Sequence, residues 1–174
     1  MALEWKDEFS VNVREVDLQR RKLVEMVSEL DKGIRTGRDE EALARSLAGV
    51  TQYARYHFAT EERLMAQSRY PDAGKHVEEH QRLINVVEEF NATFKRGSAG
   101  LNTDSVGFLE NWLAKHMLDA DKRMGKYLSA ACAASGWIGW SWQGDGLNFV
   151  TALPDKRGRP DHLGAGMVFV GLGG

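Results

Sequence analysis

The sequence predicts an all-α fold, an up-down-up-down antiparallel four-helix bundle with a glycine- and tryptophan-rich C-terminal extension. Apolar residues recur at helical spacing as far as about residue 132. Glycine, proline and capping residues near positions 36, 71 and 100 divide this region into four stretches. Helices joined by connections this short pack side by side and run antiparallel. With 174 residues, the chain is long enough to bury one sizeable core.

The first two helices can be placed from their apolar stripes and their ends. The stripe of the first helix consists of Leu18, Leu23, Val24, Val27 and Leu30. This helix ends near Gly33 and Gly37, and Thr36 or Asp39 can cap the next one. The second helix covers about residues 39–67. It stops before Tyr70-Pro71, because proline disfavours the α conformation of the residue that precedes it.

The third and fourth helices follow the same logic. Asp72 can cap the third helix, which closes at the glycines of residues 97–100. Its apolar residues are Val77, Leu83, Ile84, Val87 and Phe90. The fourth helix begins near Thr103 or Asp104. Its apolar residues are Phe108, Leu109, Trp112, Leu113, Met117 and Leu118. We expect one helix here, as in each of the three preceding stretches.

The composition changes after residue 132, which predicts a bundle domain of residues 1–132 and an extension of residues 133–174. The extension has no helical period and is rich in glycine, and Trp137, Trp140 and Trp142 lie close together in it. Residues 136–142 and 167–170 are two candidate strands. Two alternatives stay open, a paired hairpin on the bundle and a largely disordered tail.

Composition and charge exclude several classes of protein. The net charge of −2 gives no reason to expect nucleic acid or an anionic membrane as a partner. The single cysteine, Cys132, excludes an internal disulfide and a cysteine-rich metal cluster. No apolar run is long enough for a transmembrane helix, and residues 1–7 do not resemble a secretory signal. We therefore expect a cytoplasmic protein.

Histidines and carboxylates are paired at helical spacing in the predicted second and third helices. His57 and Glu61 are four residues apart, about 40° around the helix axis, so that both side chains face the same way. His76 and His80 repeat this spacing, which lets two imidazoles from one helix bind a single metal ion. Either pair alone would be weak support for a metal site, because most helical histidines and glutamates are ordinary surface or core residues.

The fourth helix adds His116 and Asp121. These residues are five positions apart, about 140° around an unbroken helix, so both reach the core only if the site lies off the flank of that helix. Burying four imidazoles and two carboxylates without a metal would leave unpaired polar atoms in the core, at considerable cost. The combination therefore predicts a metal site, and this mixture of ligands suits iron, manganese or zinc.

These residues lie in stretches that resemble the hemerythrin and bacteriohemerythrin family. The resemblance covers about residues 3–130. It rests on Tyr53-x-x-x-His57-Phe58-x-x-Glu61-Glu62-x-x-Met65, on Tyr70-Pro71-x-x-x-x-His76-x-x-x-His80 and on Trp112-Leu113-x-x-His116-x-x-x-x-Asp121. The N-terminal Trp5, Val11 and Val13 and the element Asp17-x-Gln19 also resemble the family's opening segment and first helix.

The resemblance implies a four-helix bundle with a non-haem di-iron centre that binds dioxygen reversibly at one iron. It implies that the first iron is ligated by His76, His80 and His116. Glu61 and Asp121 would bridge both irons, and His57 would ligate the second. Trp112 resembles the bulky residue that lines the family's oxygen pocket.

One position departs from the family pattern. The family's first helix supplies a further histidine directly after the Asp-x-Gln element, and this chain has Arg20 there. Arginine is always protonated and has no lone pair to donate to a metal. Three outcomes stay open. Arg20 can replace the second iron by pairing with Glu61 or Asp121, it can reach solvent while water completes that iron, or it can create an open position for anion binding or peroxide chemistry.

We therefore expect a non-haem iron-binding, hemerythrin-like protein that binds dioxygen for storage, transport or sensing and is not an enzyme. One alternative is a mono-iron or defective di-iron centre with peroxidase- or oxidase-like activity. Another is a non-catalytic interaction module, with the extension of residues 133–174 as its contact surface for a protein partner.

Overall fold

The computed structural model describes residues 3–95, 102–135, 140–143 and 146–149. Its helices are the 3-10 turn η1 (Asp7–Phe9), α1 (Arg14–Arg35), α2 (Glu40–Ser68), α3 (Ala73–Lys95), α4 (Thr103–Leu118) and α5 (Ala120–Ser135). Two short strands follow, β1 (Trp140–Gln143) and β2 (Gly146–Phe149). By its contacts the chain divides into a unit of Met1–Ser129 and a second unit that begins at Ala130. The division into domains at residue 132 stays a prediction.

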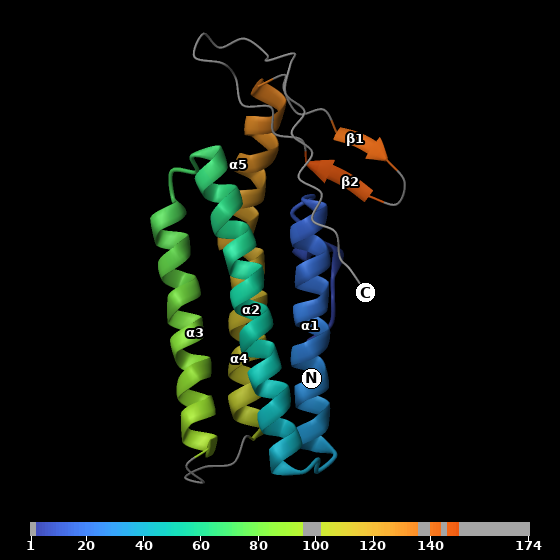
Figure 1. Ribbon diagram of the computed structural model, residues 1–174, viewed down its shortest axis with the longest axis vertical. Coiled ribbons are helices and arrows are strands. Elements are labelled where there is room, and N and C mark those ends of the chain that lie inside the picture. Colours follow the sequence, from blue (N-terminus) through green and yellow to red (C-terminus); the bar gives the residue numbers. More distant parts are fainter. Residues whose placement is uncertain (1–2, 96–101, 136–139, 144–145, 150–174) are drawn as a thin grey trace. The chain divides into compact units, whose positions relative to one another are not determined.

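The helices of the first unit form the predicted four-helix bundle (Figure 1). α1 packs against α2 and α4, and α2 packs against α3. The stripe predicted for α1 is buried from Leu23 to Leu30, but Leu18 is 55% exposed because Gln19 and Arg20 take the inner face at that level. Three other expected core residues, Val77, Phe108 and Leu118, are also largely exposed. None of the described helices is long and apolar enough to cross a membrane.

Local sequence signals explain where the helices begin and end. The side chain of Asp39 accepts a hydrogen bond from the backbone N–H of Ala42 and caps α2 as predicted. Arg69 ends that helix in the left-handed conformation, directly before Tyr70-Pro71. α3 begins directly after Asp72. The cap of α4 is Asn102, one residue before the predicted start, and it accepts from the N–H of Ser105.

The fourth stretch is interrupted, contrary to the expectation of a single helix. α4 ends at Leu118, Asp119 has φ −115° and ψ −78°, and α5 begins at Ala120. An unbroken helix would point His116 and Asp121 about 140° apart. Across this break both side chains are buried, and Asp121 Oδ1 lies 3.0 Å from His116 Nε2. His116 and Asp121 therefore reach the same part of the core although they are five residues apart.

An N-terminal arm (residues 3–13) lies along the bundle and is attached at several points. The carboxylate of Asp17 accepts from the Ser10 hydroxyl (2.6 Å) and from the backbone N–H of Val11 (2.9 Å). Lys122 donates to the Ser10 carbonyl (2.7 Å). A Cβ atom on Gly125 would lie only 2.6 Å from the Cβ atom of Val11, so the arm approaches α5 closely where α5 has no side chain.

In the second unit, β1 and β2 form an antiparallel hairpin in which Trp140 pairs with Phe149 and Gln143 with Gly146. Residues 140–142 of the predicted strand over residues 136–142 lie in β1, and residues 136–139 lie outside the described residues. Among the described residues, the partner of β1 is β2, residues 146–149. Residues 167–170, the second candidate strand, lie outside the described residues.

Candidate metal centre

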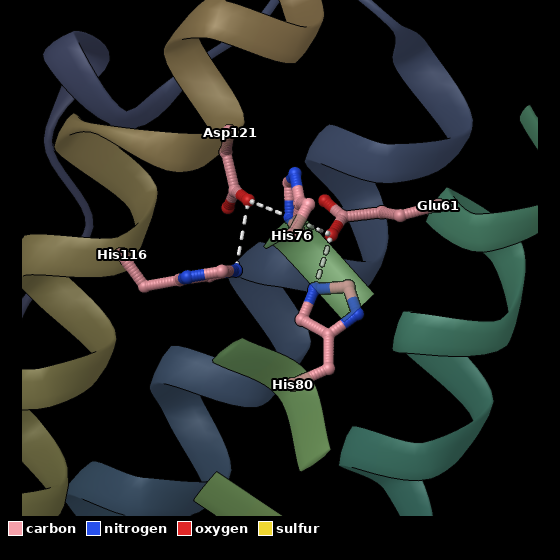
Figure 2. A group of neighbouring side chains, drawn as sticks. All are labelled: Glu61, His76, His80, His116 and Asp121. Carbon is pink, nitrogen blue, oxygen red and sulfur yellow. Dashed lines mark ion pairs between the residues drawn. The ribbon is translucent and has the colours of Figure 1, made fainter. Parts of the chain in front are cut away.

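Five buried side chains from four helices converge in the interior of the bundle (Figure 2). They are Glu61 from α2, His76 and His80 from α3, His116 from α4 and Asp121 from α5. One potential ligand atom from each lies within 4.8 Å of the others, and no member is more than 4% exposed. These five side chains, called the central cluster below, are five of the six residues predicted to bind metal.

The distances within the central cluster are those of atoms around a shared ion. Asp121 Oδ1 lies 3.0 Å from His116 Nε2 and 3.1 Å from His76 Nε2. Glu61 Oε2 lies 3.2 Å from His80 Nε2 and 3.6 Å from His76 Nε2. Ligands about 2.1 Å from one metal ion and at right angles to each other are roughly 3 Å apart. One metal ion therefore fits among these five atoms.

Two of the histidines, His80 and His116, are fixed so that their Nε2 atoms face the centre. His80 Nδ1 lies 3.0 Å from a Glu62 carboxylate oxygen, and His116 Nδ1 lies 3.1 Å from one of Glu79. A carboxylate on Nδ1 makes that nitrogen the donor and leaves the lone pair on Nε2. Stacking holds the rings, since Phe58 lies flat on His80 at 3.9 Å between centroids and Trp112 on His116 at 4.6 Å.

The converging atoms are also the ones that the protein leaves without hydrogen bonds. Glu61 Oε2, Asp121 Oδ1 and the Nε2 atoms of His76, His80 and His116 are all buried and lack a hydrogen-bond partner. Buried polar atoms without partners are rare and costly. Imidazole and carboxylate donors suit iron, zinc and manganese, so the residues present fit a metal ion of this kind.

Without metal, the contacts within the cluster keep its carboxylates ionised and raise the pKa values of His76 and His116. Burial alone would raise the pKa of Glu61, but the surrounding histidines and Arg20 outweigh burial and hold it well below its usual range. Burial alone would lower the pKa of His76, but contacts with Asp121 and Glu61 outweigh burial and raise it to about 9. Contacts with Asp121 and Glu61 likewise raise the pKa of His116 above its ordinary value. Protons on these histidines therefore balance the carboxylates in the metal-free protein.

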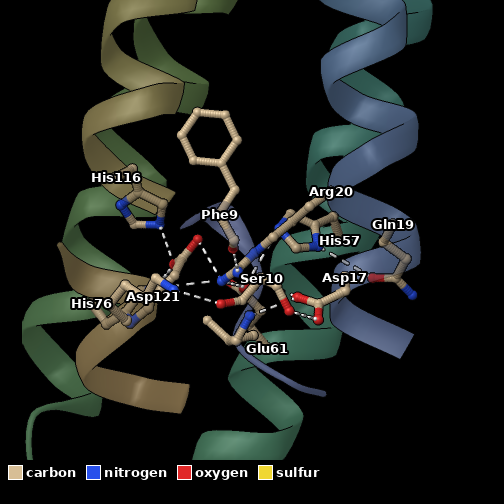
Figure 3. A network of polar contacts seen from close by, with 12 residues as sticks. Phe9, Ser10, Asp17, Gln19, Arg20, His57, Glu61, His76, His116 and Asp121 are labelled. Atoms are coloured by element: carbon tan, nitrogen blue, oxygen red, sulfur yellow. Dashed lines mark hydrogen bonds and ion pairs between the residues drawn. The ribbon is translucent and has the colours of Figure 1, made fainter. Parts of the chain in front are cut away.

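Arg20 lies on the other side of the two carboxylates (Figure 3). Its Nη2 atom donates to Glu61 Oε1 at 3.0 Å and forms an ion pair with Asp121 Oδ2 at 2.6 Å. Its Nη1 atom donates to the Phe9 carbonyl in the N-terminal arm at 2.9 Å. The side chain has no exposed surface. Of the three outcomes left open, the second is wrong: Arg20 does not reach solvent, because three acceptors hold it inside.

Comparison with known proteins identifies the family of the chain. The model of the hemerythrin HHE cation binding domain matches residues 11–128. The chain belongs to the hemerythrin family. Bacteriohemerythrin of Methylococcus capsulatus is 33% identical over 123 residues, which are 71% of this chain and 93% of that protein. Bacteriohemerythrin of Pseudomonas aeruginosa is 29% identical over 119 residues, 68% of this chain and 76% of that protein.

Solved structures agree with the sequence relatives. The crystal structure of wild-type hemerythrin is 31% identical to this chain and superposes with a TM-score of 0.70. The match covers 74% of this chain and 99% of that one. Non-haem iron is the metal of the hemerythrin family, and the central cluster of this member is of the same His and carboxylate type.

His57 is the sixth residue predicted from the hemerythrin resemblance, and it lies beside the central cluster. Its Nε2 atom is 3.5 Å from Glu61 Oε1, the oxygen that Arg20 also holds. Its Nδ1 atom faces Gln19 Oε1 at 3.2 Å. Burial lowers the pKa of His57, so its ring is neutral. A ligand role for His57 stays a prediction.

Two residues that contact histidines of the central cluster, Glu62 and Glu79, were not predicted from the sequence as functional. Glu62 is part of the quoted motif, and its position directly after Glu61 is a signal that could have been used. Glu79 has no such signal, because its partner His116 is on another helix. Trp112, predicted to line an oxygen pocket, borders a surface pocket together with Glu79 and His116. Its contact with dioxygen stays a prediction.

Proposed function

We propose that the chain binds non-haem iron in the central cluster and takes up dioxygen there, for storage, transport or sensing. The observation that carries this proposal is the set of five buried nitrogen and oxygen atoms that converge without hydrogen-bond partners. The cation-binding family to which the chain belongs supports it as well. Iron, when bound, would supply a redox-active Lewis acid with affinity for a small neutral ligand.

The protein's own residues would fix, shield and tune the iron. His76, His80 and His116 would donate through Nε2, and Glu61 and Asp121 through one oxygen each. The carboxylates of Glu62 and Glu79 would hold two of the imidazoles in the ligating tautomer and make them better donors. The stacked rings of Phe58 and Trp112 would limit the access of water to the ligands.

We place the protein among binding proteins and not among enzymes. Membership of the hemerythrin family supports this assignment. Trp112 is the residue we assign to the dioxygen side, because it stacks on a ligand and borders a pocket that opens to the surface. A protein partner for the extension stays a prediction, which deletion of residues 133–174 would test.

Anaerobic reconstitution with ferrous iron followed by exposure to air tests the proposal. We expect iron to remain bound after desalting, and a charge-transfer band to appear with air and to disappear on deoxygenation. His80→Ala should lose both properties. Glu78→Gln is the matched control, since Glu78 is exposed on the same helix and its carboxylate pairs with Arg82. Retained iron without a reversible band would remove dioxygen uptake, and absence of iron would remove the whole proposal.

A further inference from the structure

We infer that Arg20 is a fixed internal cation which closes one side of the carboxylate pair, so that the centre binds a single metal ion per chain. This inference rests on the proposed iron binding and states its stoichiometry. It goes beyond the absence of a ligand at position 20, because the structure shows what the guanidinium does there (Figure 3).

The two carboxylates have two sides with different surroundings. Glu61 Oε2 and Asp121 Oδ1 face the Nε2 atoms of the three histidines. Glu61 Oε1 and Asp121 Oδ2 face Arg20 Nη2, at 3.0 and 2.6 Å. The first side therefore offers a place for a metal ion, and the second side already contains a cation.

A second metal ion would need the space that Arg20 occupies. An ion that bridged Glu61 Oε1 and Asp121 Oδ2 would lie about 2.1 Å from each oxygen. Nη2 already contacts the same two oxygens, so an ion and the guanidinium cannot both be present there. A neutral histidine at the same position could instead join the ion as a ligand.

The charges lead to the same result. The two carboxylates carry two negative charges, and Arg20 carries one positive charge at any accessible pH. One divalent metal ion leaves the buried cluster with a single positive charge. A second divalent ion beside Arg20 would leave three, with both cations removed from water, and a buried charge without a partner is strongly disfavoured. Of the two metal-loaded arrangements, single occupancy is the nearer to neutrality.

Arg20 is also held in place by the rest of the bundle. It has no exposed surface, and its Nη1 atom donates to the Phe9 carbonyl. The arm that carries Phe9 is fixed one residue later, where Ser10 contacts both Asp17 and Lys122. Movement of the guanidinium toward solvent would therefore break contacts in the core and in the arm together.

His57 is the potential metal ligand on the side of Glu61 that Arg20 occupies. The Thr60 hydroxyl donates to the Tyr56 carbonyl and so accepts from the Gln19 side-chain nitrogen. This orients Gln19 Oε1 toward His57 Nδ1, which must be the donor. The lone pair of His57 then lies on Nε2, next to the oxygen bound by Arg20. His57 is the one imidazole on that side of Glu61 in the described residues, and the guanidinium cannot complete a metal site with it.

Metal stoichiometry tests the inference. Full-length wild-type protein is titrated anaerobically with ferrous iron, desalted and analysed for iron per chain. We expect a value near one for wild type and for Arg14→His, an exposed position on the same helix. We expect a value near two for Arg20→His. After oxidation, the wild-type iron should give the electron paramagnetic resonance signal of an isolated ferric ion, with an intensity that accounts for all the iron.

The outcomes separate the inference from the proposed function. A wild-type value near two, or a silent spectrum from a coupled ferric pair, overturns the inference and leaves iron binding intact. A value near zero overturns both. Soluble Arg20→His protein that still binds one ion overturns the role assigned to Arg20. If that variant does not fold, the wild-type stoichiometry and spectrum decide the question, because they need no substitution.

Discussion

Arg20 Nη2 lies 2.6 Å from Asp121 Oδ2, and neither side chain has any exposed surface. This ion pair joins the first helix to the last part of the bundle, through residues that are separated by most of the chain. Its attraction is strong because water is excluded, and for the same reason the loss of either partner leaves a buried charge that water cannot reach and that has lost one of its partners. The metal-free protein therefore depends on this contact.

Replacement of Asp121 by asparagine tests that dependence. The change keeps the shape of the side chain but removes the charge opposite Arg20, and breaking a buried pair in this way costs about 3–5 kcal/mol. We expect the free energy of unfolding of metal-free protein, measured in urea, to fall by that order. Asp119→Asn, which removes an exposed carboxylate paired with Arg123, should change it by no more than about 1 kcal/mol. Equal effects of the two substitutions would contradict the importance of the buried pair.

The carboxylates behind the histidines can be tested without touching a ligand. Glu62→Gln and Glu79→Gln keep a hydrogen-bond acceptor on the Nδ1 atoms of His80 and His116 but remove its charge. We expect each to weaken metal binding by about 10- to 100-fold, as loss of such partners commonly does. Competition with a chelator of known affinity measures this change. Glu78→Gln serves as the control, and unchanged affinity in both test variants would show that the tautomers are fixed by packing alone.

The pKa shifts predict how stability depends on pH. His76 has a folded pKa of about 9, above the value of about 6.5 in an unfolded chain. Its protonation therefore stabilises the metal-free fold fully below about pH 6.5, and this contribution is lost as the pH rises toward 9. The pKa of Glu61 is lowered, so its contribution is present above the unfolded value of about 4.3 and is lost as the pH falls.

The contributions of His76 and Glu61 should therefore both be present between about pH 4.5 and 6.5, and metal-free protein should lose the contribution of His76 as the pH rises to 9. Metal binding requires the histidines to be deprotonated, so the stabilisation gained by adding metal should increase as the pH rises from about 6.5 toward 9. Thermal unfolding at several pH values, with and without metal at a fixed free concentration, measures both trends. A metal-induced shift in Tm that does not grow from pH 6.5 to 8.5 would count against coordination by His76.

The close approach at Gly125 gives a prediction about the N-terminal arm. An added Cβ would meet the side chain of Val11 at 2.6 Å, so Gly125→Ala should push the arm away and cost about 1–3 kcal/mol by overpacking. Gly107→Ala is a matched control, because a Cβ there meets nothing within 4 Å. It should be neutral or stabilising by up to about 1 kcal/mol, from helix propensity. Urea unfolding of the two variants compares them directly, and equal stabilities would show that the arm yields freely.

The sequence predicted the helices and the residues of the central cluster because their signals are local. Asp39 caps a helix, Pro71 follows the end of one, and His76 and His80 are adjacent on a helical face whatever the rest of the chain does. The position of Arg20 was not predictable in the same way. Its three acceptors come from the arm, from α2 and from α5, and only the packed bundle brings them together.

The interruption of the fourth helix was missed for a related reason. Neither glycine nor proline lies between Leu118 and Ala120, so nothing in the local sequence indicates a break. The burial of Asp121 against Arg20 and His116 accompanies that break and outweighs the preference for a continuous helix. Glu79 was missed because an exposed glutamate and a ligand partner look the same until the facing helix is known.

The break at Asp119 has a consequence for how this chain can vary. Leu118 and Asp119 are exposed, so replacement of either by another residue should be tolerated. Deletion of one of them would rotate Asp121 by about 100° around the helix axis. Its carboxylate would then point away from both His116 and Arg20. Between His116 and Asp121 the chain is therefore constrained in length far more than in composition, and a one-residue deletion there is more damaging than several substitutions.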